Sequence, residues 1–132
     1  MANIGAYAAK QTLDWQLGGA AATQPASRLA ALTFGVPTSV SALGEIQANS
    51  GYVRATVTFG AAASPQNSAS NNNSFSFGPF SSSQSVLGML IYDTISINSG
   101  NIWWYGTLLT ARTVLPGDTL VVNTGALLIT LS

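Results

Sequence analysis

Gly51-Tyr-Val-Arg-Ala-Thr-Val-Thr-Phe59 is the stretch that decides the fold. Apolar residues at 53, 55, 57 and 59 alternate with polar residues at 54, 56 and 58. A period of two places the apolar side chains on one face of a strand and the polar ones on the other. The stretch therefore predicts a half-buried β-strand.

Most of the remaining chain shows the same pattern in short runs separated by turn signals. Strands are predicted at 27–34, 75–77, 86–93, 102–109, 119–122 and 126–131. Leu115-Pro-Gly-Asp118 has the central residues of a type II turn, and Asn123-Thr-Gly125 fits the loop of a closing hairpin. Short strands with regular turns indicate a sandwich or barrel. We therefore expect a mainly β fold: a single antiparallel β-sandwich or jelly-roll-like domain of about seven to eight strands over residues 1–132.

The start of the chain is the one place with a helical pattern. Ala6, Ala9, Leu13 and Leu17 recur at helical spacing, Asn3 is a suitable N-cap, and residues 18 and 19 are both Gly. This predicts one short N-terminal helix over 4–17. Residues 1–19 then form either a packing helix or an arm that docks on another subunit.

Residues 60–74 form a low-complexity stretch that is rich in Ser, Asn and Ala and carries no charge. With little to bury, this stretch predicts a long loop or extended arm. The aromatic residues Phe75, Phe77 and Phe80 follow directly.

Only eight of the 132 side chains carry a formal charge, and the chain has no His and no Cys. Charged residues make up about a quarter of a typical soluble protein. A folded monomer of this size would expose roughly 6,500 Å², or about one charge per 800 Å², the area that one partner contributes to a standard interface. Such a surface suits a subunit that is covered by copies of itself or by neighbours.

The same scarcity excludes several classes of function. Binding of nucleic acid or of a membrane surface needs clustered basic residues, which the chain lacks, and no apolar run is long enough to span a bilayer. Without His or Cys, the commonest proton shuttle and the thiolate metal ligands are missing. A glycosidase-like site would require Asp93 and Asp118, or either with Glu45, to meet in a cleft. We therefore expect no enzyme, cofactor, metal, nucleic acid or membrane partner.

Two groups of residues are candidates for contacts. Phe75, Phe77, Phe80 and one of Trp103 and Trp104 are expected to contribute to an interface, because neighbouring strand residues point to opposite faces and a one-sided core takes only one of the two Trp. A sugar-binding platform is the alternative for the Trp pair. Arg54 is expected to form an ion pair with Asp93 or Glu45, either at the surface or as a buried structural pair; we favour Asp93.

Several segments resemble, in order and at similar spacing, a family of small tailed-phage virion proteins. They are Pro25-Ala-Ser-Arg-Leu-Ala-Ala-Leu-Thr33, the Gly-Tyr-x-Arg strand at 51–59, Ile91-Tyr-Asp93, Trp104-Tyr-Gly-Thr-Leu108, Val114-Leu-Pro-Gly-Asp-Thr-Leu120 and Gly125-Ala-Leu-Leu-Ile-Thr-Leu131. Members are tail fibre, head fibre or capsid decoration (cement) proteins. The resemblance implies a structural role, usually in a homo-oligomer on the virion, and no catalytic residues.

The leading functional hypothesis is a capsid decoration or cement protein. It would be a homotrimer on the capsid exterior that bridges and stabilises major capsid proteins through added buried area. The alternative is a tail or fibre component, or an adaptor, that contacts a host receptor or other tail proteins.

Overall fold

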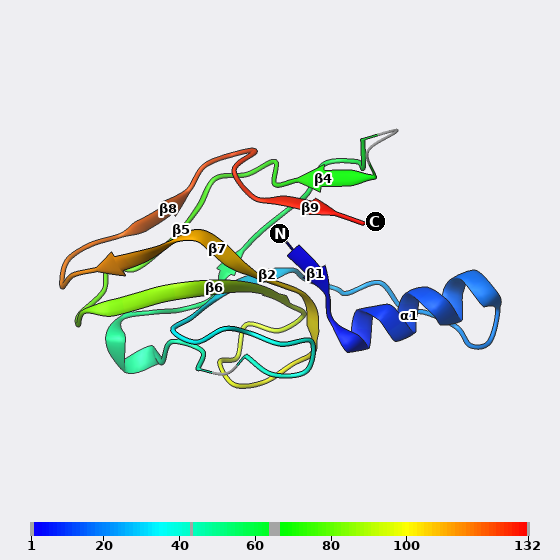
Figure 1. Ribbon diagram of the computed structural model, residues 1–132, viewed down its shortest axis with the longest axis horizontal. Helices are drawn as coiled ribbons and strands as arrows, with labels where there is room; N and C mark the ends of the chain where they lie inside the picture. Colours follow the sequence, from blue (N-terminus) through cyan, green and yellow to red (C-terminus); the bar gives the residue numbers. More distant parts are fainter. Residues whose placement is uncertain (1, 43, 64–66, 132) are drawn as a thin grey trace.

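Five antiparallel strands form the central sheet of the molecule (Figure 1). The computed structural model describes residues 2–42, 44–63 and 67–131. The central sheet has the order β1-β7-β6-β2-β3, with β1 Ala2–Ile4, β7 Ile102–Val114, β6 Gln84–Tyr92, β2 Leu29–Thr33 and β3 Ala55–Thr56. Two small antiparallel sheets complete the strands: β4 Ser68–Ser70 with β9 Leu128–Thr130, and β5 Phe75–Phe77 with β8 Leu120–Val122.

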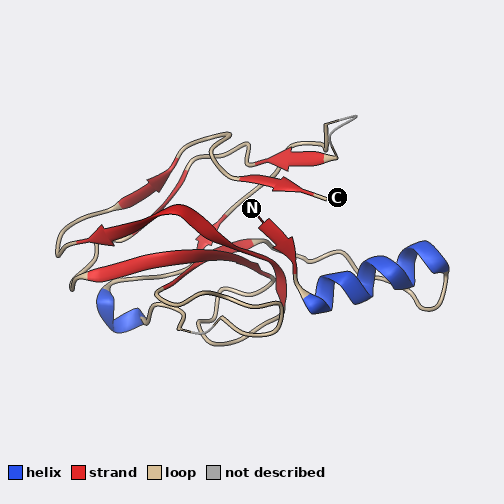
Figure 2. Cartoon of the chain, in the orientation of Figure 1, coloured by secondary structure: helices blue, strands red, loops and turns tan. Residues whose placement is uncertain are grey.

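The predicted fold class is confirmed: the described residues are mainly β, with antiparallel pairing throughout and one α-helix, α1 Ala6–Leu17 (Figure 2). A short 3₁₀ turn, η1 Ala48–Ser50, precedes β3. The described residues form nine strands, more than expected, because the Ser/Asn-rich stretch supplies β4 and the first residues supply β1.

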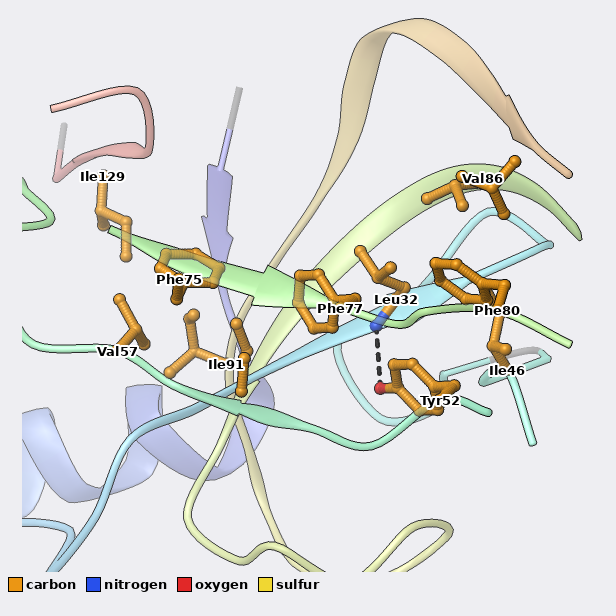
Figure 3. Packing of buried hydrophobic residues seen from close by; sticks show 13 residues of the cluster. Leu32, Ile46, Tyr52, Val57, Phe75, Phe77, Phe80, Val86, Ile91 and Ile129 are labelled. Atoms are coloured by element: carbon orange, nitrogen blue, oxygen red, sulfur yellow. Dashed lines mark hydrogen bonds between the residues drawn. The ribbon is translucent and has the colours of Figure 1, made fainter. Parts of the chain in front are cut away.

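Apolar side chains cover both faces of the central sheet. On one face, Leu32 and Ile91 pack with Phe77 and Ile129 from the small sheets (Figure 3). On the other face, Leu90 packs within a second cluster beneath the loops that follow β2 and β6. Figure 1 shows the small sheets on one side of the central sheet and these loops on the other. All five residues of β2 are therefore buried, as expected for a strand with both faces covered.

In the stretch 51–59, the alternation of inward and outward side chains is interrupted at Arg54 and Ala55. Val53 is exposed, Arg54 and Ala55 are both buried, and Thr56 and Thr58 point outward. The alternation therefore holds from 55 onward, but the strand itself covers only Ala55–Thr56. The period is broken because the Arg54 side chain enters the interior to meet a buried carboxylate.

The Ser/Asn-rich stretch is more ordered than its composition suggests. It contains β4, and Asn71 is buried, although residues 64–66 lie outside the described residues. The Asn71 side chain donates to the carbonyl oxygens of Asn73 and Asn123 and accepts from the N–H of Leu127. These bonds join the stretch to the turn between β8 and β9, because a buried amide must satisfy its hydrogen bonds internally.

The last two predicted strands form, but the hairpin between them does not. β8 pairs with β5 and β9 pairs with β4, so the turn at 123–125 connects two different sheets. The predicted turn at 115–118 is present: Gly117 has a φ of 88°, and the N–H of Asp118 donates to the oxygen of Leu115 at 2.9 Å.

A large bulge with several extra residues on β7 interrupts the pairing of β6 with β7. Val86 lies opposite Arg112, whereas Gly88 lies opposite Thr107, so the single residue Leu87 faces the four residues 108–111. Extra residues on one strand bend it and push side chains out of the ladder. Leu109 in this bulge is fully exposed.

Candidate contact surface and the buried ion pair

The centre of the molecule holds an ion pair between Arg54 and Glu45, each only 2% exposed. The guanidinium donates from Nε to Oε1 at 2.7 Å and from Nη2 to Oε2 at 2.8 Å. This parallel, bidentate geometry is the strong form of an Arg–carboxylate contact. Glu45 itself follows β2 and forms an isolated bridge with Thr33, which fixes the carboxylate beside the sheet.

Further groups around the pair satisfy its remaining hydrogen-bonding capacity. The Tyr52 hydroxyl accepts from the N–H of Leu32 (Figure 3). It donates to Glu45 Oε1, and the N–H of Asn98 donates to Glu45 Oε2. The Arg54 guanidinium also lies 3.6 Å from the centre of the Tyr92 ring. Burial raises the pKa of the Tyr52 hydroxyl, and the nearby Glu45 charge raises it further.

The ion pair positions the loop that joins β6 to β7. Arg54 Nη1 donates to the carbonyl oxygens of Thr94 at 2.7 Å and of Ser99 at 2.9 Å. Among the described residues, no buried side-chain nitrogen or oxygen lacks a hydrogen-bond partner. The cluster therefore has a structural role: it holds three separate segments of the chain together.

Asp93 is not the partner of Arg54, which corrects the favoured expectation; the alternative partner, Glu45, is the right one. Asp93 instead accepts hydrogen bonds from the N–H and side chain of Asn101, at 2.9 and 2.8 Å, and from Trp103 Nε1 at 3.3 Å. Partial burial alone would raise the pKa of this carboxyl, but the hydrogen bonds from Asn101 and Trp103 outweigh it and lower the pKa.

The three carboxylates considered for catalysis serve three separate local structures. Glu45 belongs to the buried pair, Asp93 closes the β6–β7 loop, and Asp118 accepts the N–H of Leu115 in the exposed turn. Within the described ranges, no three His, Cys, Asp or Glu side chains gather as metal ligands would. No helix in the described part of the chain has the length and apolarity needed to cross a bilayer.

The expected contact role of Phe75, Phe77 and Phe80 needs correcting. All three side chains are buried in the core, with Phe77 completely inaccessible, and Phe77 stacks near Tyr52 (Figure 3). The three residues lie beneath the small sheets because β5 pairs with β8 over the central sheet. They therefore hold the two layers together and present no surface to another molecule.

Trp103 and Trp104 are partly exposed, and each also has partners within the chain. Trp104 packs against the first core cluster, and the ring centres of Trp103 and Tyr7 lie 5.5 Å apart in an edge-to-face arrangement. The pairing of β6 with β7 shifts register at Trp103, and both Trp side chains line one hollow beside Ile91 and Ile129, so a simple division between the two faces of the strand does not apply. Contact of either Trp with another molecule stays a prediction.

The α1 arm, residues 6–17, projects away from the strands (Figure 1). Its root is fixed where the N–H of Gly5 donates to the oxygen of Trp103 at 2.8 Å and the N–H of Ala6 donates to the oxygen of Ser39 at 3.0 Å. A Cβ on Gly5 would lie 2.1 Å from the oxygen of Ile102, so only Gly fits here. Gly5, not Asn3, is the N-cap, because residues 2–4 pair with β7.

The apolar stripe of α1 faces outward. Ala6, Ala9, Leu13 and Leu17 lie within about 80° of one another on a helix of 3.6 residues per turn. The buried residue of the helix is Ala8, on nearly the opposite side, while Leu13 is 55% and Leu17 78% exposed. Trp15, closer to the Ala8 side, is also 72% exposed. Leu13 and Leu17, at the far end of the stripe, therefore keep most of their side-chain surface in solvent, whereas Ala9 is half-buried.

An open cavity of about 590 Å³ lies at the root of the arm. Its lining includes Ala6 and Tyr7 from α1, Phe34 and Val40 from the loop after β2, and the buried residues Tyr92 and Glu45. Because the Glu45 charge is compensated by Arg54, the cavity is neutral. Phe34 and Val40 are mostly exposed, but polar residues such as Ser39, Gln47 and Asn101 also line the cavity, so its lining is mixed.

Little charge remains at the surface. Burial of Glu45 and Arg54 leaves six charged side chains over 7232 Å², about one per 1,200 Å². Lys10 and Asp14 also form an ion pair with each other on α1, at 2.5 Å. Sequence reasoning identified the low charge but could not identify the outward stripe or the cavity rim, because apolar spacing alone does not tell which face of a helix is covered.

Comparison with known proteins assigns a family to the chain. Residues 3–130 match a family model described as "Podophage GP4 fiber I protein gp80". No curated protein matches the chain. The matched residues include the arm, the central sheet and both small sheets, so the family match extends over nearly the whole chain.

Proposed function

The chain belongs to the podophage GP4 fiber I protein gp80 family, and on this premise we propose that it is a tail or fibre component that acts through contacts with other virion proteins. It is a phage virion structural protein of fibre type, and the family is the non-enzymatic class that the sequence predicts. The match does not support the expected preference for a cement role on the capsid exterior. The fibre alternative is therefore the hypothesis that we carry forward.

The observation that carries the proposal is the distribution of charge and apolar surface. Two of the eight charges are buried in the ion pair, and large apolar side chains stand in solvent on α1, at the cavity rim and on the β7 bulge. Interface cores are depleted of charge relative to the rest of the surface. A surface of this kind is suited to being covered in an assembly, as a fibre subunit is.

Counting and locating the protein in purified particles tests the proposal. We expect few copies per particle relative to the major capsid protein, and density for the chain at a fibre or at the tail. Quantitative mass spectrometry gives the ratio, and electron microscopy of particles carrying a tagged chain gives the position. A copy number that follows the capsid lattice, with the tag spread over the shell, would support the cement hypothesis and contradict the proposal.

A further inference from the structure

We propose that a hollow between the central sheet and the β4–β9 sheet binds one acidic sugar, a pyranose ring that carries a carboxylate. The side chains that would hold the sugar are Arg28, Trp103 and Trp104, which all line the hollow. The proposal deepens the fibre role, on which it rests, by naming what an exposed virion protein would bind outside the particle. Its test uses the isolated chain in solution, whereas the test of the fibre role concerns position on the particle.

The hollow is recessed among strands of both layers, on the side of the molecule where β9 lies against β1 (Figure 1). Ile91 of β6 and Ile129 of β9 are buried, and every other lining residue is half-buried. The volume of the hollow is about 220 Å³. Pockets that enclose a drug-sized ligand measure about 300–1,000 Å³. The hollow is therefore matched to a single ring and is too small for a helix or a folded partner.

Arg28 gives the hollow a positive charge that no described residue neutralises. The ion pairs of the described chain involve Arg54 and Lys10, and the Arg28 guanidinium has no hydrogen bond or ion pair to any described residue. The Arg28 backbone is fixed, because its carbonyl oxygen accepts the N–H of Val57 at 2.9 Å. A guanidinium presents a planar fork of donors that fits a carboxylate. The hollow therefore favours an anionic group.

The two indole rings supply the second feature of the site. Trp103 is held by the hydrogen bond from Nε1 to Asp93 Oδ2 at 3.3 Å and by its contact with Tyr7, and Trp104 packs against the first core cluster. The face of an aromatic ring is electrostatically negative and attracts the C–H groups of a sugar ring. Because both rings are already held within the chain, little side-chain freedom is lost when a ligand binds.

The indole N–H of Trp104 adds a donor that is open to a ligand. Trp104 Nε1 has no hydrogen-bond partner among the described residues, and it is not one of their buried polar atoms. With Arg28, it gives the residues of the hollow two unpaired donors beside apolar walls. Sugars and carboxylates are rich in acceptor oxygens, so both donors favour the same ligand.

The combination of one cation with two aromatic rings favours an acidic sugar over other occupants. An inorganic anion would contact Arg28 but gain nothing from the apolar walls, and a neutral sugar would leave the guanidinium without a counter-charge. A nucleic acid selects several clustered cations, and the hollow has one. An acidic protein side chain has too short a stem to cover two indole rings. A carboxylate-bearing pyranose uses the charge and the rings together.

Tryptophan fluorescence of a Trp15→Phe variant reads the hollow directly. Trp15 is the one tryptophan of three outside the hollow and is 72% exposed on α1, so its replacement leaves emission from Trp103 and Trp104 alone. We expect glucuronic, galacturonic or N-acetylneuraminic acid to change this emission with a Kd on the order of 1 mM, as ligands of this size allow. Glucose and galactose, which lack the carboxylate, should bind at least about tenfold more weakly.

Arg28→Gln in the same background should weaken binding of the acidic sugar at least about tenfold and abolish the preference over the neutral sugar. The matched control is Arg112→Gln, which removes an exposed guanidinium outside the hollow and should keep the Kd unchanged. Arg28→Lys retains the charge without the planar fork, so we expect an intermediate Kd. Far-UV circular dichroism establishes that each variant is folded.

Succinate tests whether a carboxylate is enough without a sugar ring, as an acidic side chain of another protein would present it. Equal binding of succinate and the acidic sugars would overturn the proposal. So would an unchanged emission with all three acidic sugars, equal binding of the neutral sugars, or equal losses in Arg28→Gln and Arg112→Gln. Binding of an acidic sugar by a protein that follows the capsid lattice would support this site and contradict the fibre assignment alone.

Discussion

The ion pair at the centre and the arm at the edge invert the usual placement of charged and apolar groups. Arg54 and Glu45 are almost completely buried, whereas Leu13 and Leu17 lie mostly in solvent. Around the ion pair, every hydrogen-bonding group has a partner within the chain. Along the arm, Ala8 is buried and Tyr7 packs on Trp103 at the root, whereas Trp15 and Leu17 at the far end lie mostly in solvent. In the described residues, the body therefore satisfies its buried polar groups internally, whereas the far end of the arm leaves apolar side chains in solvent.

The residues that stabilise the fold are therefore distinct from the residues expected to contact other molecules. A change in the body should alter the free energy of unfolding, and a change in the arm should alter assembly. The predictions below test that separation, beginning with the change that should disturb the body most.

Replacing Arg54 by Met should have the largest effect on stability. The variant leaves the Glu45 carboxylate buried without its cation, and breaking a buried ion pair costs about 3–5 kcal/mol. Urea unfolding at fixed protein concentration measures the loss. The matched control is Arg112→Met on an exposed Arg, expected within about 0.5 kcal/mol of wild type. Equal effects of the two variants would show that the buried pair is not special.

Phe77→Ala should destabilise the body by a comparable amount. The side chain is fully buried between the two layers, and such truncations cost about 3–5 kcal/mol. Leu109→Ala, on a fully exposed residue of the β7 bulge, is the control and should stay within about 0.5 kcal/mol. A Phe77→Ala variant that kept wild-type stability but lost assembly would show that Phe77 is an interface residue and not a core residue.

Asn71→Ala should have an intermediate effect. It removes one acceptor and one donor group that serve three backbone partners, and an unsatisfied buried polar group costs about 1–3 kcal/mol. The neighbouring Asn72→Ala removes an exposed contact with Thr58 and should cost less than about 1 kcal/mol. Thermal unfolding of both variants gives the comparison, and a larger loss for Asn72→Ala would contradict the role of Asn71.

The smallest expected effect is on the pH dependence of the free energy of unfolding. The folded-state pKa of Asp93 lies below its ordinary value because of the hydrogen bonds from Asn101 and Trp103. Its contribution to stability is therefore present above about pH 4 and is lost as the pH falls through the folded pKa. We expect the free energy of unfolding of Asp93→Asn to fall less than that of the wild type as the pH is lowered below about 4. An unchanged pH dependence would mean that these hydrogen bonds do not favour the charged form.

The sequence predicted the class of fold because period two and turn chemistry are local signals. The turn at Leu115–Asp118 formed as expected, since Pro restricts φ at the first central position and Gly tolerates the positive φ at the second. The pairing of β8 and β9 was not predictable in the same way. Asn123-Thr-Gly125 can close a hairpin, but β5 and β4 compete for the two strands, and that competition is not visible in the local sequence.

The contact surface was less predictable than the fold. Low charge predicts a surface suited to contacts, and that stays a prediction. Aromatic content pointed to Phe75, Phe77 and Phe80, which pack inside. The break of alternation at Arg54 arises from its long-range partner Glu45, which periodicity cannot detect. The helical stripe at Ala6, Ala9, Leu13 and Leu17 was visible in the sequence, yet only the structure shows that it faces away from the body.

Hydrogen exchange of the α1 amides in purified particles tests most directly the central claim, that the apolar surface is covered in the assembled virion. An uncovered twelve-residue helix with weak caps should exchange quickly, whereas a docked helix should approach the protection of β6. The account predicts that α1 in the particle approaches the protection of β6, which serves as the internal reference. Fast exchange of α1 in the particle, with β6 protected, would contradict it.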